Sequence, residues 1–153
     1  MKRFYSVLLC ISLMLALAFP AHAAEVVSES KKNITNITVL GDGVTVIDEI
    51  FEVSSARSTD KTYTRRRTFE KNGTTVGIIA ITALFRYDGN SVYVISKAVT
   101  QTDTYEGWNY KQNSFTSSGG TVTLDAKLTK LLVLNIPFTM TLTCDKNGNI
   151  SYS

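Results

Sequence analysis

Hydrophobic and polar residues alternate along two segments in the last third of the chain, residues 121–129 and 136–144. Every second side chain of a β-strand lies on the same face, so each segment gathers its apolar residues on one face. The pattern predicts two strands, each with one buried and one wet face. The apolar positions are Val122, Leu124, Ala126, Leu128 and Leu132 in the first strand, where Lys130 interrupts the face, and Ile136, Phe138, Met140, Leu142 and Cys144 in the second.

Segments rich in β-branched residues precede these two strands. We predict strands over residues 44–53, 62–70, 75–87 and 92–100, and a short closing strand over 150–152. The acidic residues of 44–53 would also allow an amphipathic helix there. Residues 75–87 are apolar at odd and even positions alike, which is typical of a central strand covered on both sides.

Turn sequences separate the predicted strands. Asn72-Gly73 and Asn147-Gly148 favour two-residue hairpin turns, because Asn and Gly readily adopt positive φ angles. Asp88-Gly89-Asn90 is a further turn signal. The segment 145–149 also resembles half of a calcium loop, but it lacks the downstream glutamate, so a hairpin turn accounts for it better. The pattern predicts an all-β fold: an antiparallel β-sandwich or a partly open barrel built of hairpins.

The first residues have the organisation of a secretory signal peptide. A basic start precedes an apolar run over residues 7–19, and Pro20 and Ala21-His22-Ala23 follow the run. We predict cleavage after Ala23 and a secreted, extracellular protein without a transmembrane segment after cleavage. An uncleaved N-terminal anchor and a lipid attached to Cys10 are the alternatives, although the run is shorter than a spanning helix requires.

These patterns divide the chain into three parts. We predict a signal peptide over residues 1–23, an N-terminal lead-in segment over 24–43 and a single β domain over 44–153. The lead-in is rich in Ser, Lys, Asn and Thr, and apolar residues near its end favour a short strand that docks on the domain.

Cleavage changes the residues that are available for chemistry. The single histidine, His22, leaves together with Cys10, so the mature chain keeps no histidine and one thiol, Cys144. Loss of Lys2 and Arg3 leaves 14 basic residues against 13 acidic ones, a formal charge of +1 that does not favour nucleic acid as a partner. We interpret Cys144 as a small buried hydrophobe rather than as an intermolecular disulfide or a reactive thiol.

The mature chain carries no recognisable catalytic motif. Without histidine, Ser-His-Asp and Cys-His arrangements are excluded, and clustered zinc ligands and a phosphate-binding loop are missing too. We predict a protein that is not an enzyme, with no catalytic residues, no metal and no cofactor. A carboxylate-based hydrolase is the alternative, with Asp48 and Glu52 on one face of a strand and Glu49 on the other. We interpret these carboxylates as solvated charges at a sheet edge.

Three consecutive arginines lie in the segment 62–70. On a strand, Arg65 and Arg67 share a face with Tyr63 and Phe69, and Arg66 points away. This face is a candidate patch for anions or polysaccharides, with Tyr63 stacking on a ring. The alternative is an edge strand whose charges block aggregation between sheets.

Aromatic residues gather in a second segment, where Tyr105, Trp108 and Tyr110 flank Gly107. Tyrosine and tryptophan on a β-sandwich can stack on sugar rings, so these residues are candidate binding residues. The alternative is that Trp108 closes the end of the core and that the tyrosines fill cross-strand pairs.

Hairpin and core motifs recur between Thr68 and Ser153. They are Asn72-Gly73-Thr74 leading into Val76-Gly77, Phe85-Arg86-Tyr87-Asp88-Gly89, Gly107-Trp108, and Leu142-Thr143-Cys144-Asp145 followed by Asn147-Gly148. In these motifs the chain resembles small exported β-rich proteins of Gram-positive bacteria, a family of unknown function. The resemblance covers just over half of the chain and implies a secreted β domain, with no activity to transfer.

The sequence thus favours a secreted, non-catalytic β domain that binds a surface component, either a glycan or a protein. Missing histidine and the aromatic cluster support this hypothesis. A secreted antibacterial or membrane-active toxin is the alternative, permitted by the small size and by Arg65 to Arg67.

Overall fold

The computed structural model describes residues 31–54, 59–131 and 133–153. The predicted signal peptide with its cleavage site at Ala23, the first part of the lead-in and Leu132 lie outside these residues. The described chain consists of strands and turns without a helix, and 79% of it is strand. It therefore contains no helix long and apolar enough to cross a membrane.

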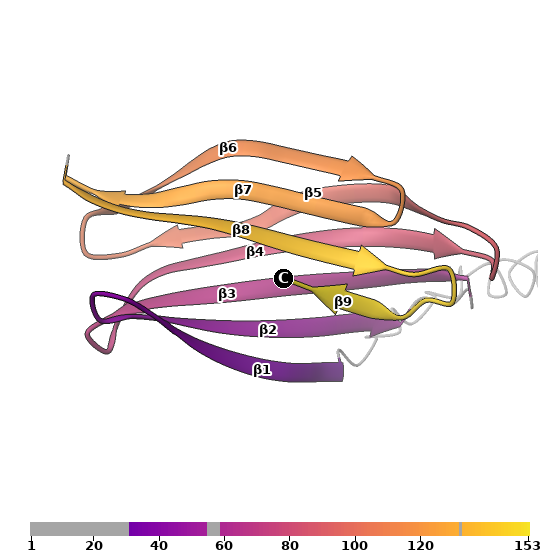
Figure 1. Ribbon diagram of the computed structural model, residues 1–153, viewed down its shortest axis with the longest axis horizontal. Coiled ribbons are helices and arrows are strands. Elements are labelled where there is room, and N and C mark those ends of the chain that lie inside the picture. Colours follow the sequence, from indigo (N-terminus) through magenta and orange to yellow (C-terminus); the bar gives the residue numbers. More distant parts are fainter. Residues whose placement is uncertain (1–30, 55–58, 132) are drawn as a thin grey trace, which may run out of the picture.

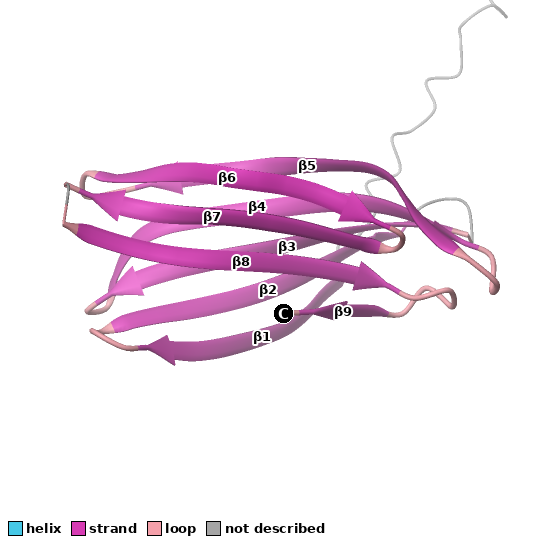
Figure 2. Ribbon diagram, turned by 45° about the horizontal axis from the view of Figure 1, so that its top comes forward, coloured by secondary structure: helices cyan, strands magenta, loops and turns pink. Residues whose placement is uncertain are grey.

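The described residues form nine antiparallel strands in two sheets that pack face to face (Figure 1). One sheet has the order β1-β2-β3-β4-β5 and the other β6-β7-β8-β9, so each strand pairs with its neighbour in sequence. The strands are β1 (Lys31–Leu40), β2 (Val44–Ser54), β3 (Asp60–Lys71), β4 (Thr74–Tyr87), β5 (Val92–Thr104), β6 (Trp108–Ser118), β7 (Thr121–Lys130), β8 (Leu134–Cys144) and β9 (Ile150–Tyr152). Neither sheet closes on itself (Figure 2), so the all-β prediction is confirmed in its sandwich form.

The core lies between the two sheets, and alternation decides which residues enter it. The inward positions of β7 and β8 are buried as predicted, from Val122 to Leu128 and from Ile136 to Cys144. They meet the inward face of the larger sheet, where Phe69 stacks at 4.7 Å between ring centroids on Phe138. Burying apolar surface from both sheets in this layer, at about 25 cal/mol per Å², is the main stabilising contribution.

Turns occur where the sequence predicts them, but the two-residue form is present only at Asn72-Gly73; at Asn147-Gly148 only the glycine has a positive φ, and the turn spans residues 145–149. Asn72 and Gly73 both have positive φ angles, 52° and 79°, as a two-residue hairpin turn requires. In the turn before β9, Asp145 Oδ1 accepts hydrogen bonds of 2.8 Å from the backbone nitrogens of Asn147 and Asn149. These bonds show that the segment with the half calcium loop is a hairpin turn.

Two strands differ from the sequence prediction at the ends of the sheets. The expected short strand of the lead-in is β1, which pairs with β2 along nearly its whole length. Strand β6 was not anticipated, because its sequence, WNYKQNSFTSS, is polar and lacks clear alternation. It forms because it pairs with the strongly patterned β7.

The prediction that β4 is covered on both sides is wrong. Its inward face packs on the second sheet, but among the described residues no layer covers the outward face. Ile78 and Leu84 on that face are half-buried by neighbouring side chains of the same sheet. The proposal of an edge position for residues 62–70 is wrong too, since β3 lies between β2 and β4.

Gly148 is a position where the fold requires glycine. Its φ is +81°, and a Cβ there would lie 2.5 Å from the ring of Tyr87. We expect Gly148→Ala to lower the free energy of unfolding by about 2–4 kcal/mol, since it adds a clash to backbone strain. Gly89→Ala is the matched control, because Gly89 has a φ of +85° but open space around it, so only the strain of about 1–2 kcal/mol applies. Equal losses in urea denaturation would contradict the packing of Tyr87 on this turn.

Candidate functional site

Asp48, Arg65 and Arg67 form a charged cluster between the sheets, which we call the arginine clamp. Arg65 is 1% exposed and Asp48 5% exposed. Arg65 Nε donates to Asp48 Oδ1 at 3.0 Å, and Arg67 donates from Nε to Oδ1 at 3.0 Å and from Nη2 to Oδ2 at 2.8 Å. One carboxylate on β2 thus holds two guanidinium groups of the adjacent strand, β3.

The clamp also joins the two sheets. Arg65 Nη1 donates to the backbone oxygens of Thr141, at 2.9 Å, and of Ser153, and Arg67 Nη1 donates to Thr139 O at 2.9 Å. The Thr139 and Thr141 carbonyls lie on the side of β8 that β9 leaves largely open, because β9 pairs only with residues 142–144. Pro137 lies on the same side, where its missing N–H is tolerated at a sheet edge. The guanidinium groups therefore satisfy acceptors that a longer β9 would pair.

The carboxyl pKa of Asp48 reflects this environment. Burial by itself raises the pKa, but hydrogen bonds and charge attraction from Arg67 and Arg65 outweigh it, and the pKa lies below its ordinary value of 3.8. Arg65 also lies over the ring of Tyr152, with 5.1 Å between the guanidinium carbon and the ring centroid. Arg65 and Arg67, predicted as binding residues, thus point into the sandwich, with their guanidinium groups bonded inside the fold.

The three carboxylates proposed for a hydrolase do not converge. Asp48 and Glu52 share a face of β2 and Glu49 lies on the other, as predicted. Asp48 and Glu52 are four positions apart along β2, which places them about 13 Å from each other. A retaining glycosidase needs its two carboxyl groups about 5 Å apart. Each of the three carboxylates is also ion-paired, and Glu49 Oε2 accepts from Arg66 Nε at 2.7 Å. The interpretation as solvated edge charges is wrong for Asp48 and Glu49, which are buried on an inner strand.

The aromatic candidates Tyr105, Trp108 and Tyr110 do not form one stacking surface. Trp108 is 5% exposed and belongs to the hydrophobic core. Tyr110 is partly buried and packs against that core, and Tyr105 is 43% exposed in the turn before β6. The structure thus places Trp108 at the end of the core, as in the alternative interpretation. No group of three residues able to hold a metal ion occurs in the described part of the chain.

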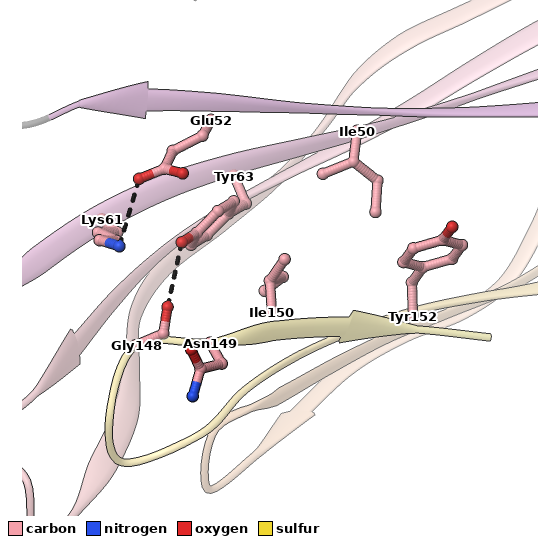
Figure 3. A pocket seen from close by; sticks show the side chains of 8 residues that line it. All are labelled: Ile50, Glu52, Lys61, Tyr63, Gly148, Asn149, Ile150 and Tyr152. Carbon is pink, nitrogen blue, oxygen red and sulfur yellow. Dashed lines mark hydrogen bonds and ion pairs between the residues drawn. The ribbon is translucent and has the colours of Figure 1, made fainter. Parts of the chain in front are cut away.

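A groove of about 290 Å³ opens between β9 and the strands β2 and β3 (Figure 3). We call it the β9 groove. Tyr63 and Ile50 face Ile150 and Tyr152 across it, as Figure 3 shows. Its complete lining is Ile50, Glu52, Lys61, Tyr63, Gly148, Asn149, Ile150 and Tyr152.

Polar groups occupy one end of the β9 groove. Lys61 Nζ lies 3.3 Å from Glu52 Oε1, and both side chains are partly exposed. Tyr63 donates its phenolic hydrogen to Gly148 O at 3.2 Å, which ties β3 to the turn before β9. Burial raises the pKa of Tyr63, so the phenol is neutral around neutral pH. The arrangement combines an aromatic and aliphatic wall with one anion and one cation.

Among the groove residues, sequence reasoning singled out Tyr63 as a possible stacking residue and Glu52 as a hydrolase candidate, but it did not bring them together in a groove. Short strand β9 meets β2 and β3 across the sandwich, and nothing in the local sequence signals that contact. The remaining thiol, Cys144, is buried, and burial together with the adjacent Asp145 raises its pKa to about 11. The thiol is therefore protonated and inert at neutral pH, as interpreted from the sequence.

No protein-family model, curated protein or solved structure matches the chain.

We expect Asp48→Asn to destabilise the protein by about 3–5 kcal/mol, because it leaves two buried guanidinium groups without a counter-charge. Glu49→Gln is the matched control on the next residue of β2. Glu49 itself is buried, but its ion-pair partner Arg66 has a side chain that is 39% exposed and can be hydrated when the pair is broken, so the loss should be smaller, about 1–2 kcal/mol. Urea denaturation followed by circular dichroism measures both, and similar losses would contradict the structural role of the clamp.

The depressed pKa of Asp48 also predicts a pH dependence. Because the folded pKa lies below the unfolded one, the stability that Asp48 contributes is fully present above about pH 4 and is lost as the pH falls through the folded pKa. In a ¹³C NMR titration of the folded protein, the Asp48 carboxyl should titrate below 3.8. A midpoint at or above that value would show that the arginines do not outweigh burial.

Proposed function

We propose that the protein is an exported, non-catalytic β domain that binds a cell-surface glycan in the β9 groove. The signal-like N-terminus supports export. One observation carries the binding proposal, namely the meeting of an aromatic wall and an ion-paired rim in a single groove.

The apolar wall and the charged end of the groove match the apolar face and the hydroxyl groups of a sugar ring. The apolar C–H face of a pyranose packs on the partly exposed side chains of Tyr152 and Ile150, while Tyr63 and Ile50, which are 3% and 2% exposed, form the floor of the groove. Hydroxyl groups of the same ring can donate to Glu52 and accept from Lys61. With a volume of about 290 Å³ the groove is at the small end of ligand sites, which favours a terminal or single sugar residue over a long chain.

The arginine clamp supports the groove from behind. Arg65 lies over the ring of Tyr152 and donates to the backbone oxygen of Ser153, so it fixes the end of β9 that carries Tyr152. A side chain that is held in place before binding loses less conformational freedom when the ligand arrives. The three-residue strand β9 can therefore present a rigid aromatic wall.

We expect the double variant Glu52→Gln/Lys61→Gln to lose glycan affinity by about tenfold or more, because charged hydrogen-bonding groups are replaced by neutral ones. The fold should persist, since this partly exposed pair stabilises it by about 1 kcal/mol at most. Asp60→Asn/Arg86→Gln is the matched control: it neutralises the ion pair between β3 and β4, outside the groove lining.

A glycan array of neutral, amino and acidic sugars identifies a binding sugar, and calorimetry with that sugar compares the variants. Failure of every sugar class to bind, or binding that both double variants weaken equally, would refute the proposal.

A further inference from the structure

Four turns meet at one end of the sandwich, on the left in Figures 1 and 2. They are the turns at 41–43, 72–73 and 105–107 and the connection between β7 and β8, of which Leu131 and Val133 are described, and we call this surface the four-turn end. The backbone nitrogen of Asn72 donates to Gly43 O at 2.8 Å, which joins the first two turns. A cavity of about 260 Å³ joins the others, with Lys71, Glu106 and Lys130 in its lining. The four-turn end is therefore one continuous surface.

Exposed apolar side chains concentrate on this surface. Nine large apolar side chains are exposed in the described part of the chain, and six of them lie in or beside the four turns. The six are Val39, Leu40, Tyr105, Leu131, Val133 and Leu134. Leu131 and Val133 are 81% and 84% exposed, so they project from the protein with almost no neighbours. Clustered exposed apolar side chains mark an interaction surface.

Leu131 adds an independent observation. Four non-glycine residues of the described segments have positive φ angles, and they occur one to a turn: Asp42, Asn72, Glu106 and Leu131. In the first three turns a polar residue precedes glycine, as hairpin turns favour, but the fourth has leucine at a φ of 52°. Leucine there is strained where Asn or Gly would be relaxed. A strained, exposed leucine points to a role for its side chain outside the fold.

The order of residues at this end matches the depth profile of a membrane surface. Aliphatic side chains form the tip, Tyr105 lies in the neighbouring turn, and Lys71 and Lys130 line the cavity behind the tip. In a bilayer interface, aliphatic groups enter the acyl region, aromatic residues lie at the headgroups and lysines extend toward them. Fluid lipid also solvates projecting side chains without the complementary shape that a protein partner must supply.

We infer that the four-turn end inserts into the interfacial region of a lipid bilayer, with Leu131 and Val133 as the leading side chains. Asp42 and Glu106 balance Lys71 and Lys130 at this end, so apolar insertion rather than charge drives the binding. The inference is independent of the β9 groove, whose lining shares no residue with this surface.

Co-sedimentation with phosphatidylcholine vesicles tests the inference. We expect the protein to bind these vesicles, with little gain when phosphatidylglycerol is added. The variant Leu131→Asn/Val133→Ser should reduce the partition coefficient by about a hundredfold, since each buried aliphatic side chain contributes about tenfold or more. Asparagine tolerates the positive φ of residue 131, so this variant keeps the turn.

The matched control is Tyr93→Asn/Ile95→Ser, which removes two exposed apolar side chains of β5 and should leave vesicle binding unchanged. Absence of binding to either vesicle type, or equal losses in both variants, would overturn the inference. So would a dimer in sedimentation equilibrium that Leu131→Asn/Val133→Ser dissociates, because the tip would then be covered by a second copy of the chain.

Discussion

The sandwich depends on a charged interaction in a place where apolar packing is the rule. Asp48 is ion-paired with both Arg65 and Arg67, and the remaining guanidinium nitrogens donate to backbone oxygens of β8 and of Ser153. Removing Asp48 would leave both guanidinium groups without a counter-charge, which costs far more than the intact group contributes. The charge network therefore acts mainly as a constraint on geometry: the sheets can dock only where these partners meet.

This constraint explains how a very short strand can be ordered at the side of the sandwich. β9 has three residues, and it pairs only with the last three residues of β8, from Leu142 to Cys144. Farther along β8, Arg65 and Arg67 donate hydrogen bonds to the backbone oxygens of Thr141 and Thr139. Pro137, on the same edge, has no backbone N–H to donate. An edge with its carbonyls occupied and a donor missing is a poor template for pairing with another chain. The same side chains that hold β9 therefore also protect β8.

Much of the fold could be predicted from local pattern, and the site could not. Alternation identified β7 and β8 with the correct buried faces, and Asn72-Gly73 identified its hairpin, because both signals are local. The polar sequence of β6 carries no such signal, and only its pairing with β7 makes it a strand. The sequence showed that Arg65 and Arg67 share a face, but which way that face points depends on the second sheet, whose contacts lie more than 70 residues away. The β9 groove escaped prediction for the same reason.

The sequential order of strands has a consequence for how the chain folds. Every paired strand is next to its partner in sequence, so each sheet can grow by adding one hairpin after another, at a small entropic cost for each closure. Contacts between distant segments form mainly when the two finished meanders dock. In the docked state Arg65 donates a hydrogen bond to the backbone oxygen of Ser153, 88 residues further along the chain. Because Ser153 directly follows β9 of the second meander, the docked state is completed only when both meanders have formed, and a first meander that forms earlier exposes one apolar face until then.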